Sequence, residues 1–162
     1  MKTEASYHQK SQNRGVFIPI EVWGLFEKGL EKDGIEKGGI SSLELRYLIK
    51  INGYVKSKGI GCFASSERLG KELNCSSGAI RNMTHRLKKM DLIVITGAIT
   101  IGNKKYSIRE TSWSRAIPNR IAPDILEKGY QEDLQKKFKC PVKITLTCNP
   151  KITATHNRED YR

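Results

Sequence analysis

Residues 62–109 read CFASSERLGKELNCSSGAIRNMTHRLKKMDLIVITGAITIGNKKYSIR. The stretch holds two short segments whose apolar residues recur at helical spacing, each preceded by a serine, and then a run rich in β-branched residues. Serine is a preferred helix N-cap because its hydroxyl accepts a hydrogen bond from a backbone N–H of the first turn. We therefore predict two capped helices followed by an antiparallel hairpin.

The first of these helices is predicted to begin after Ser65 and to bury Leu69 and Leu73. Gly70 is a small residue at a point where the next helix must approach closely. Asn74 follows the helix, and asparagine is, after glycine, the residue type that best tolerates the left-handed conformation at a helix end. The chain can therefore reverse direction within a few residues.

The second helix is predicted over residues 77–90, with Ser76 as its N-cap. Its buried side is expected to hold Ile80, Met83 and Leu87. The opposite side is polar and basic, and it comprises Gly78, Arg81, Asn82, His85 and Lys88.

A hairpin is predicted over residues 92–109, with Asp91 ending the preceding helix at a positive φ. Its turn falls either at Gly97 or at Gly102-Asn103, and both choices remain open at this point. Lys104 and Lys105 follow the second of these turns.

The remaining chain supplies further elements around this stretch. Residues 1–15 are predicted to form a flexible arm whose basic residues are Lys2, Lys10 and Arg14. Residues 16–109 are predicted to form one domain, with an amphipathic helix after Pro19 that buries Ile20, Trp23, Phe26 and Leu30, and with a second helix that begins near Ser41. Residues 110–162 are predicted to form an extension with a helix over about 123–139 and a strand over 141–148.

Charge and composition narrow the function. The chain of 162 residues has a net charge of +12, of which residues 61–109 carry +6 from nine basic and three acidic side chains. Such an excess favours an anionic partner. No apolar run approaches the roughly 20 residues that span a bilayer, and the polar N-terminus is unlike a signal peptide, so we expect a cytoplasmic protein without a membrane partner.

Neither catalysis nor metal binding is indicated. The four cysteines are Cys62, Cys75, Cys140 and Cys148, and no pair of them has the CxxC spacing of a zinc site. His8, His85 and His156 lie far apart, with no nucleophile or acid pair beside them. We therefore predict a protein that is not an enzyme and that needs no metal or cofactor.

The order of elements resembles the winged helix-turn-helix domains of bacterial transcription regulators and of plasmid and phage replication proteins. The resemblance lies in Phe63-Ala64-Ser65, Leu69, Leu73, Cys75-Ser76, Ile80-Arg81, Leu87, Leu92-Ile93 and the earlier Ile18-Pro19. It implies an α+β fold, mainly α with a small β-hairpin, flanked by an N-terminal helix and a C-terminal helical extension. It also implies a cytoplasmic protein that binds double-stranded DNA sequence-specifically, as a transcription regulator or as an origin-binding replication factor of a mobile element.

The resemblance places the helix over 77–90 in the major groove and the hairpin over 92–109 on the adjacent backbone or groove. Base-reading candidates are Ser77, Arg81, Asn82 and His85, because arginine can bond guanine and asparagine can bond adenine in bidentate fashion. Candidates for contact with the DNA backbone are Ser76, Arg86, Lys88, Lys89, Lys104 and Lys105.

Two interpretations stay open at this stage. An apolar stripe in the C-terminal helix comprises Leu126, Tyr130, Leu134 and Phe138, and it either forms a homodimer contact or packs on the first helix. The alternative to DNA reading is a winged-helix module for protein interaction, in which the basic face meets an acidic protein.

Overall fold

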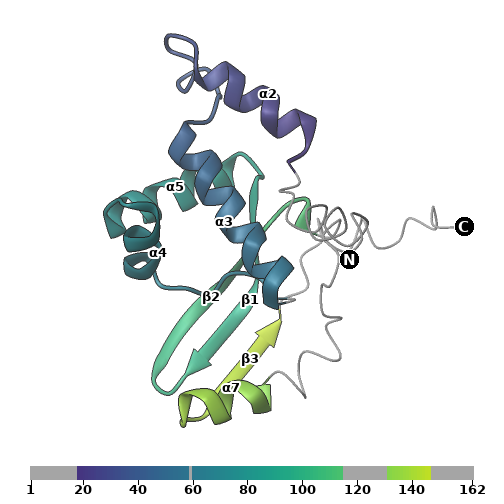
Figure 1. Ribbon diagram of the computed structural model, residues 1–162, viewed down its shortest axis with the longest axis vertical. Helices are drawn as coiled ribbons and strands as arrows, with labels where there is room; N and C mark the ends of the chain where they lie inside the picture. The colour runs from purple at the N-terminus through teal and green to yellow at the C-terminus, as the bar shows by residue number, and fades with distance from the viewer. Residues whose placement is uncertain (1–17, 59, 115–130, 147–162) are drawn as a thin grey trace, which may run out of the picture. The chain divides into compact units, whose positions relative to one another are not determined.

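The computed structural model describes residues 18–58, 60–114 and 131–146. The chain divides into two compact units, residues 1–41 and residues 42–162. The described part is α+β, with a small antiparallel sheet (Figure 1). The predicted α+β class is confirmed, whereas the predicted arm over residues 1–15 lies outside the described residues.

In the first unit, helix α2 spans Ile20–Gly29 and begins after Pro19, as predicted. Its buried residue is Val22, while Ile20, Trp23 and Leu30 are exposed. The predicted buried stripe was therefore wrong for these three residues. Trp23 instead lies along the helix surface, where its Nε1 donates to Glu27 Oε1 at 2.9 Å.

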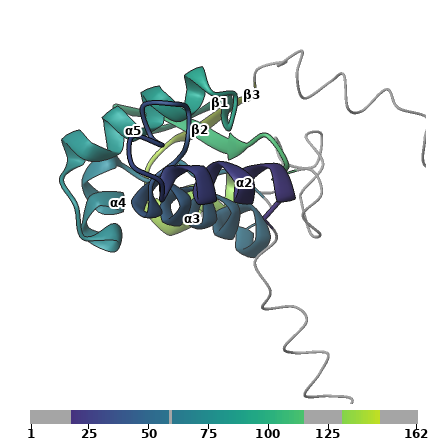
Figure 2. The same cartoon turned by 90° about the horizontal axis from the view of Figure 1, so that it is seen from above.

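The second unit begins with α3 (Ser42–Lys58), and then the chain pairs briefly with a later strand through the bridge between Cys62 and Arg109. Helix α4 (Ser66–Leu73) and helix α5 (Ser77–Lys89) follow, side by side in Figures 1 and 2. Both predicted caps are confirmed. The Oγ of Ser65 accepts from Arg68 N at 3.2 Å, and the Oγ of Ser76 accepts from Ala79 N at 3.0 Å.

The turn between α4 and α5 works as its sequence predicts. Asn74 is the C-cap of α4 and has a left-handed backbone, with φ of 56°. At Gly70, a Cβ would lie 2.6 Å from the carbonyl oxygen of Cys75, which is closer than real contacts allow. The absence of a side chain at this glycine lets the turn fold back onto α4. The second predicted positive φ is also confirmed, at Asp91 with φ of 59°.

The core of the second unit is built from the apolar sides of α3, α4 and α5 and from the first strand. The predicted buried residues of α4 and α5 are confirmed as buried. The most deeply buried side chains of this core are Tyr47, Leu48, Ile51, Leu69, Ile80, Leu87 and Ile93.

Strands β1 (Ile93–Ile101) and β2 (Lys104–Thr111) form the hairpin, and its turn lies at Gly102-Asn103, where Gly102 has φ of 61°. Gly97 is instead part of β1, next to a break in the β1–β2 register that follows Ile95. A third strand, β3 (Val142–Leu146), pairs antiparallel with the tip half of β1. The described strands thus form one sheet in the order β2-β1-β3.

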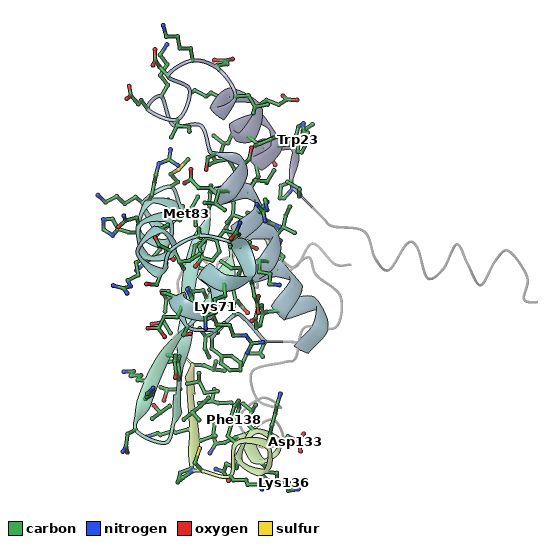
Figure 3. The ribbon with its side chains drawn as sticks, turned by 60° about the vertical axis from the view of Figure 1, so that its left-hand side comes forward. Trp23, Lys71, Met83, Asp133, Lys136 and Phe138 are labelled. Atoms are coloured by element: carbon green, nitrogen blue, oxygen red, sulfur yellow. The ribbon has the colours of Figure 1, made fainter. Side chains whose placement is uncertain are left out.

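Helix α7 (Gln131–Phe138) packs beside β3 at the tip half of the hairpin (Figure 1). It matches the C-terminal part of the helix predicted over 123–139, while Leu126 and Tyr130 lie outside the described residues. Leu134 is buried against Ile99, Ile108, Val142 and Ile144 of the sheet. Asp133, Lys136 and Phe138, which are labelled in Figure 3, are exposed. Leu134 is thus used within the chain, and it is not available for a dimer contact.

We predict that Leu134→Ala lowers the free energy of unfolding by about 2–5 kcal/mol, because it opens a cavity in the cluster between α7 and the sheet. Phe138→Ala, in the same helix, removes a side chain that is 41% exposed and should cost less than about 1 kcal/mol. Urea unfolding of the two variants measures the difference. Equal losses would contradict the assignment of Leu134 to the core.

Candidate functional site

A groove of about 820 Å³ lies between the start of α4, one side of α5 and strand β2. Its walls bring together residues that are far apart in the sequence, from Ala64 to Arg109. Five of the ten predicted DNA-binding residues line it, and they come from both the helix and the hairpin. These five are Arg81, His85, Lys88, Lys104 and Lys105.

The wall formed by α5 follows from its helical period. Arg81, His85 and Lys88 are spaced four and three residues apart, so they lie along one side of the helix. All three are exposed. One turn before Arg81, Ser77 accepts a hydrogen bond from Arg81 Nη2 at 3.3 Å, and this contact orients the guanidinium along the helix. Ser77 is therefore placed to position Arg81.

Asn82 and Lys89 belong to the neighbouring stripe of α5 and do not line the groove. Both side chains are exposed. Ser76 caps the helix, as described above, so its hydroxyl is engaged in holding the first turn. Ser76 thus has a structural role as the helix cap. Asn82 and Lys89 have exposed side chains and no such role.

The position of Arg86 differs from its predicted place in the site. Its Nη1 donates to Glu44 Oε2 at 2.5 Å, in an ion pair between α5 and α3. Glu44 is 4% exposed, so its carboxylate needs this cation inside the protein. The guanidinium of Arg86 therefore joins α5 to α3, and its contact with the DNA backbone stays a prediction.

Beneath the groove lies the buried side chain of Arg109, which is 8% exposed. Its Nη1 donates to the hydroxyl of Tyr47 at 2.9 Å, and its Nη2 donates to the carbonyl oxygen of Ala64. Its Nε has no hydrogen-bond partner in the described part of the chain, and none of the ion pairs found there includes this arginine. The floor of the groove thus holds a cation that no described carboxylate neutralises.

The hydrogen bonds continue from Arg109 into α5. Burial raises the pKa of Tyr47, so its hydroxyl stays protonated while it accepts from Arg109. The Tyr47 hydroxyl lies 2.7 Å from Thr84 Oγ1, which itself donates to the carbonyl oxygen of Ile80 at 2.8 Å. Since Thr84 uses its proton in that bond, Tyr47 is the donor to Thr84. One chain of donors therefore connects β2 to α3 and to α5.

Several residues of the groove were not predicted from the sequence. Ser65, Ser66 and Glu67 were read only as the start of a helix, and Tyr106 and Ser107 only as part of a strand. Only one indication of their role is present in the sequence: Tyr106 and Ser107 directly follow the predicted contact residues Lys104 and Lys105. Glu67 is the one acidic residue that lines the groove.

Neither a metal site nor a membrane span is found in the described residues. No three His, Cys, Asp or Glu side chains among them are grouped so that they could hold a metal ion. No described helix is both long and apolar enough to cross a bilayer. Neither a protein-family model, nor a curated protein, nor a solved structure matches this chain.

We predict that Tyr47→Phe lowers the free energy of unfolding by about 1–3 kcal/mol, because it leaves a buried guanidinium with one acceptor fewer. Tyr106→Phe is the matched control, since no hydrogen bond of the Tyr106 hydroxyl is found among the described residues. Urea denaturation of the two variants gives the comparison. If the two tyrosine hydroxyls contributed equally, the chain of donors would not support the fold.

Proposed function

We propose that this protein binds double-stranded DNA sequence-specifically, with α5 in the major groove and the β1–β2 hairpin on the adjacent backbone. The observation that carries the proposal is the basic groove above the buried cation of Arg109. A cation without a carboxylate partner attracts an anion, and the DNA backbone supplies a continuous row of them.

The charges around the groove favour a polyanion. Helix α5 contains no acidic residue, and four exposed cationic side chains line the groove together with the buried Arg109, against the single carboxylate of Glu67. These four exposed cations are Arg81, Lys88, Lys104 and Lys105. Lysine and arginine side chains in such an arrangement would neutralise phosphates and release condensed counterions.

The exposed side of α5 offers groups that can distinguish bases. Arg81 has the donors for a bidentate contact with guanine, and Asn82 has the donor and acceptor for adenine. Both are in the first half of the helix, the half that reaches base edges in helix-turn-helix proteins. His85 lies one turn after Arg81, and Ser77 supports the guanidinium of Arg81.

The order of elements also supports the proposal. Helix α3, the short bridge at Cys62, helices α4 and α5, and the β1–β2 hairpin follow one another as in a winged helix-turn-helix. Strand β3 and helix α7 add to the tip half of the hairpin. In this proposal they would stiffen the wing.

Two biological roles use the same contacts, namely transcription regulation and origin binding in a mobile element. Both would place the protein in the cytoplasm. A homodimer would place two recognition helices on paired half-sites. Because Leu134 is buried within the chain, a contact through α7 would depend on the exposed Phe138.

The test begins with selection of bound duplexes from a random-sequence DNA library. Fluorescence anisotropy then compares the selected duplex with a shuffled duplex of equal length across a salt series. Preference for the selected duplex at physiological salt is the expected result. Equal, salt-sensitive binding to both duplexes would contradict sequence-specific reading.

We predict that Arg81→Ala combined with Asn82→Ala removes most of the preference for the selected duplex, because each bidentate base contact is worth about 1–3 kcal/mol. Non-specific affinity should fall much less. Arg46→Ala, an exposed arginine of α3 outside the groove, is the control and should leave the preference unchanged. Full preference in the double variant would favour the alternative role as a protein-interaction module.

We predict that Lys104→Ala combined with Lys105→Ala weakens binding to both duplexes alike and lowers the slope of log affinity against log salt by about 2, since each phosphate contact contributes about 0.9. The exposed pair Lys136 and Lys137 of α7 is the matched control. An unchanged slope in the hairpin variant would show that the hairpin does not touch the backbone.

A further inference from the structure

A second groove, of about 540 Å³, lies between α3 and α4. From α3 it is lined by Arg46, Ile49, Lys50 and Gly53, which recur at the spacing of one helix side, and by Tyr54. From α4 it is lined by Arg68, Glu72 and Leu73. It shares no lining residue with the basic groove beside α5.

The two walls of this groove are joined by one carboxylate. Glu72 of α4 contacts Lys50 Nζ of α3 at 2.9 Å and Arg68 Nε at 3.1 Å. These two partners lower the pKa of Glu72, the hydrogen bond from Lys50 contributing most, so the carboxylate stays charged at neutral pH. Three cations against one anion leave the groove with a net charge of +2.

The cations still have donors to offer. The hydrogen bond of the Arg68 guanidinium to Glu72 uses its Nε, and the side chain is 62% exposed. Arg46 is exposed and makes no polar contact with any residue in the described ranges. Both guanidinium groups can therefore bind carboxylates of a partner bidentately.

The rest of the lining is apolar. It also includes Gly53, at a position where the fold leaves room for a side chain. Leu73 is buried, Ile49 is half-buried and Tyr54 is 8% exposed. Gly53 lies inside α3, where glycine is less favourable than alanine, yet a Cβ there would meet nothing within 4 Å. An absent side chain at an open helix surface lets another chain approach the backbone closely.

We propose that the α3–α4 groove binds an acidic amphipathic helix of a partner protein. The apolar side of such a helix would cover the half-buried Ile49 beside Gly53, and its carboxylates would meet Arg46 and Arg68. A nucleic acid fits this groove less well, because its phosphates would leave the apolar part of the lining without a complement. The proposal is independent of DNA binding at the other groove.

The probe is a fluorescein-labelled synthetic helical peptide with leucines at i, i+4 and i+7 and glutamates beside them, titrated with the full-length protein by anisotropy. Two matched peptides carry lysine in place of glutamate or serine in place of leucine. We expect the acidic peptide to bind and each altered peptide to bind about tenfold more weakly or worse. Failure of the acidic peptide to bind, or equal binding of all three, overturns the proposal.

Variants then locate the binding. Arg46→Glu combined with Arg68→Glu should weaken the acidic peptide about tenfold or more, whereas Lys71→Glu, an exposed lysine of α4 outside the groove and labelled in Figure 3, should have little effect. DNA affinity is measured in parallel on the same variants. A loss of DNA affinity with unchanged peptide binding would make this groove a nucleic-acid surface and overturn the proposal.

Gly53→Ala separates binding from folding. It should raise the Tm by roughly 2 to 4 °C, because alanine is the better helix former, and at the same time weaken the acidic peptide severalfold by blocking close approach. Gly24→Ala, in an equally open helix position outside the groove, should leave peptide binding unchanged. Unchanged peptide affinity in the stabilised Gly53→Ala variant would refute close approach at this glycine.

Discussion

The buried guanidinium of Arg109 is the constraint on which the second unit depends. It donates to Tyr47 of α3 and to the carbonyl oxygen that precedes α4, while its backbone pairs with Cys62. Through Tyr47 the same hydrogen bonds reach Thr84 of α5. One set of hydrogen bonds centred on this side chain therefore connects the hairpin with the three helices, in addition to their shared apolar core. That arrangement sets the width of the groove between α5 and β2.

Burial of the Arg109 side chain costs free energy, because a charged group is removed from water. An arginine that is 8% exposed loses most of its hydration, and Nε remains without a partner in the described structure. Replacement of a buried ion by apolar residues is often neutral or stabilising. A bound anion would offset part of this cost, because it would stand next to a charge that is already buried and fixed in place.

Local features were predictable from the sequence, whereas contacts over long separations were not. The caps Ser65 and Ser76 and the left-handed Asn74 depend on atoms within a few residues, so their types decided their roles. Arg86 looked like a phosphate contact because it stands in a basic run, and its partner Glu44 lies 42 residues earlier. Likewise Arg109 bonds Tyr47 across 62 residues, which no periodicity reveals. Sequence thus predicted the basic side of α5 but not what lies beneath the groove.

The two grooves show how the same residue types create different surfaces. Beside α5, exposed lysine and arginine side chains line the groove together with the buried Arg109. Glu67 is the single carboxylate in this lining, so the groove favours a strong polyanion. Between α3 and α4 the carboxylate of Glu72 links Lys50 to Arg68. The positive charge that remains in this groove is smaller, and part of its lining is apolar. A ligand for the second groove must therefore supply apolar contact as well as negative charge. Helix α4 contributes to both, so the ion pairs that hold Glu72 also fix the helix that borders the proposed DNA site.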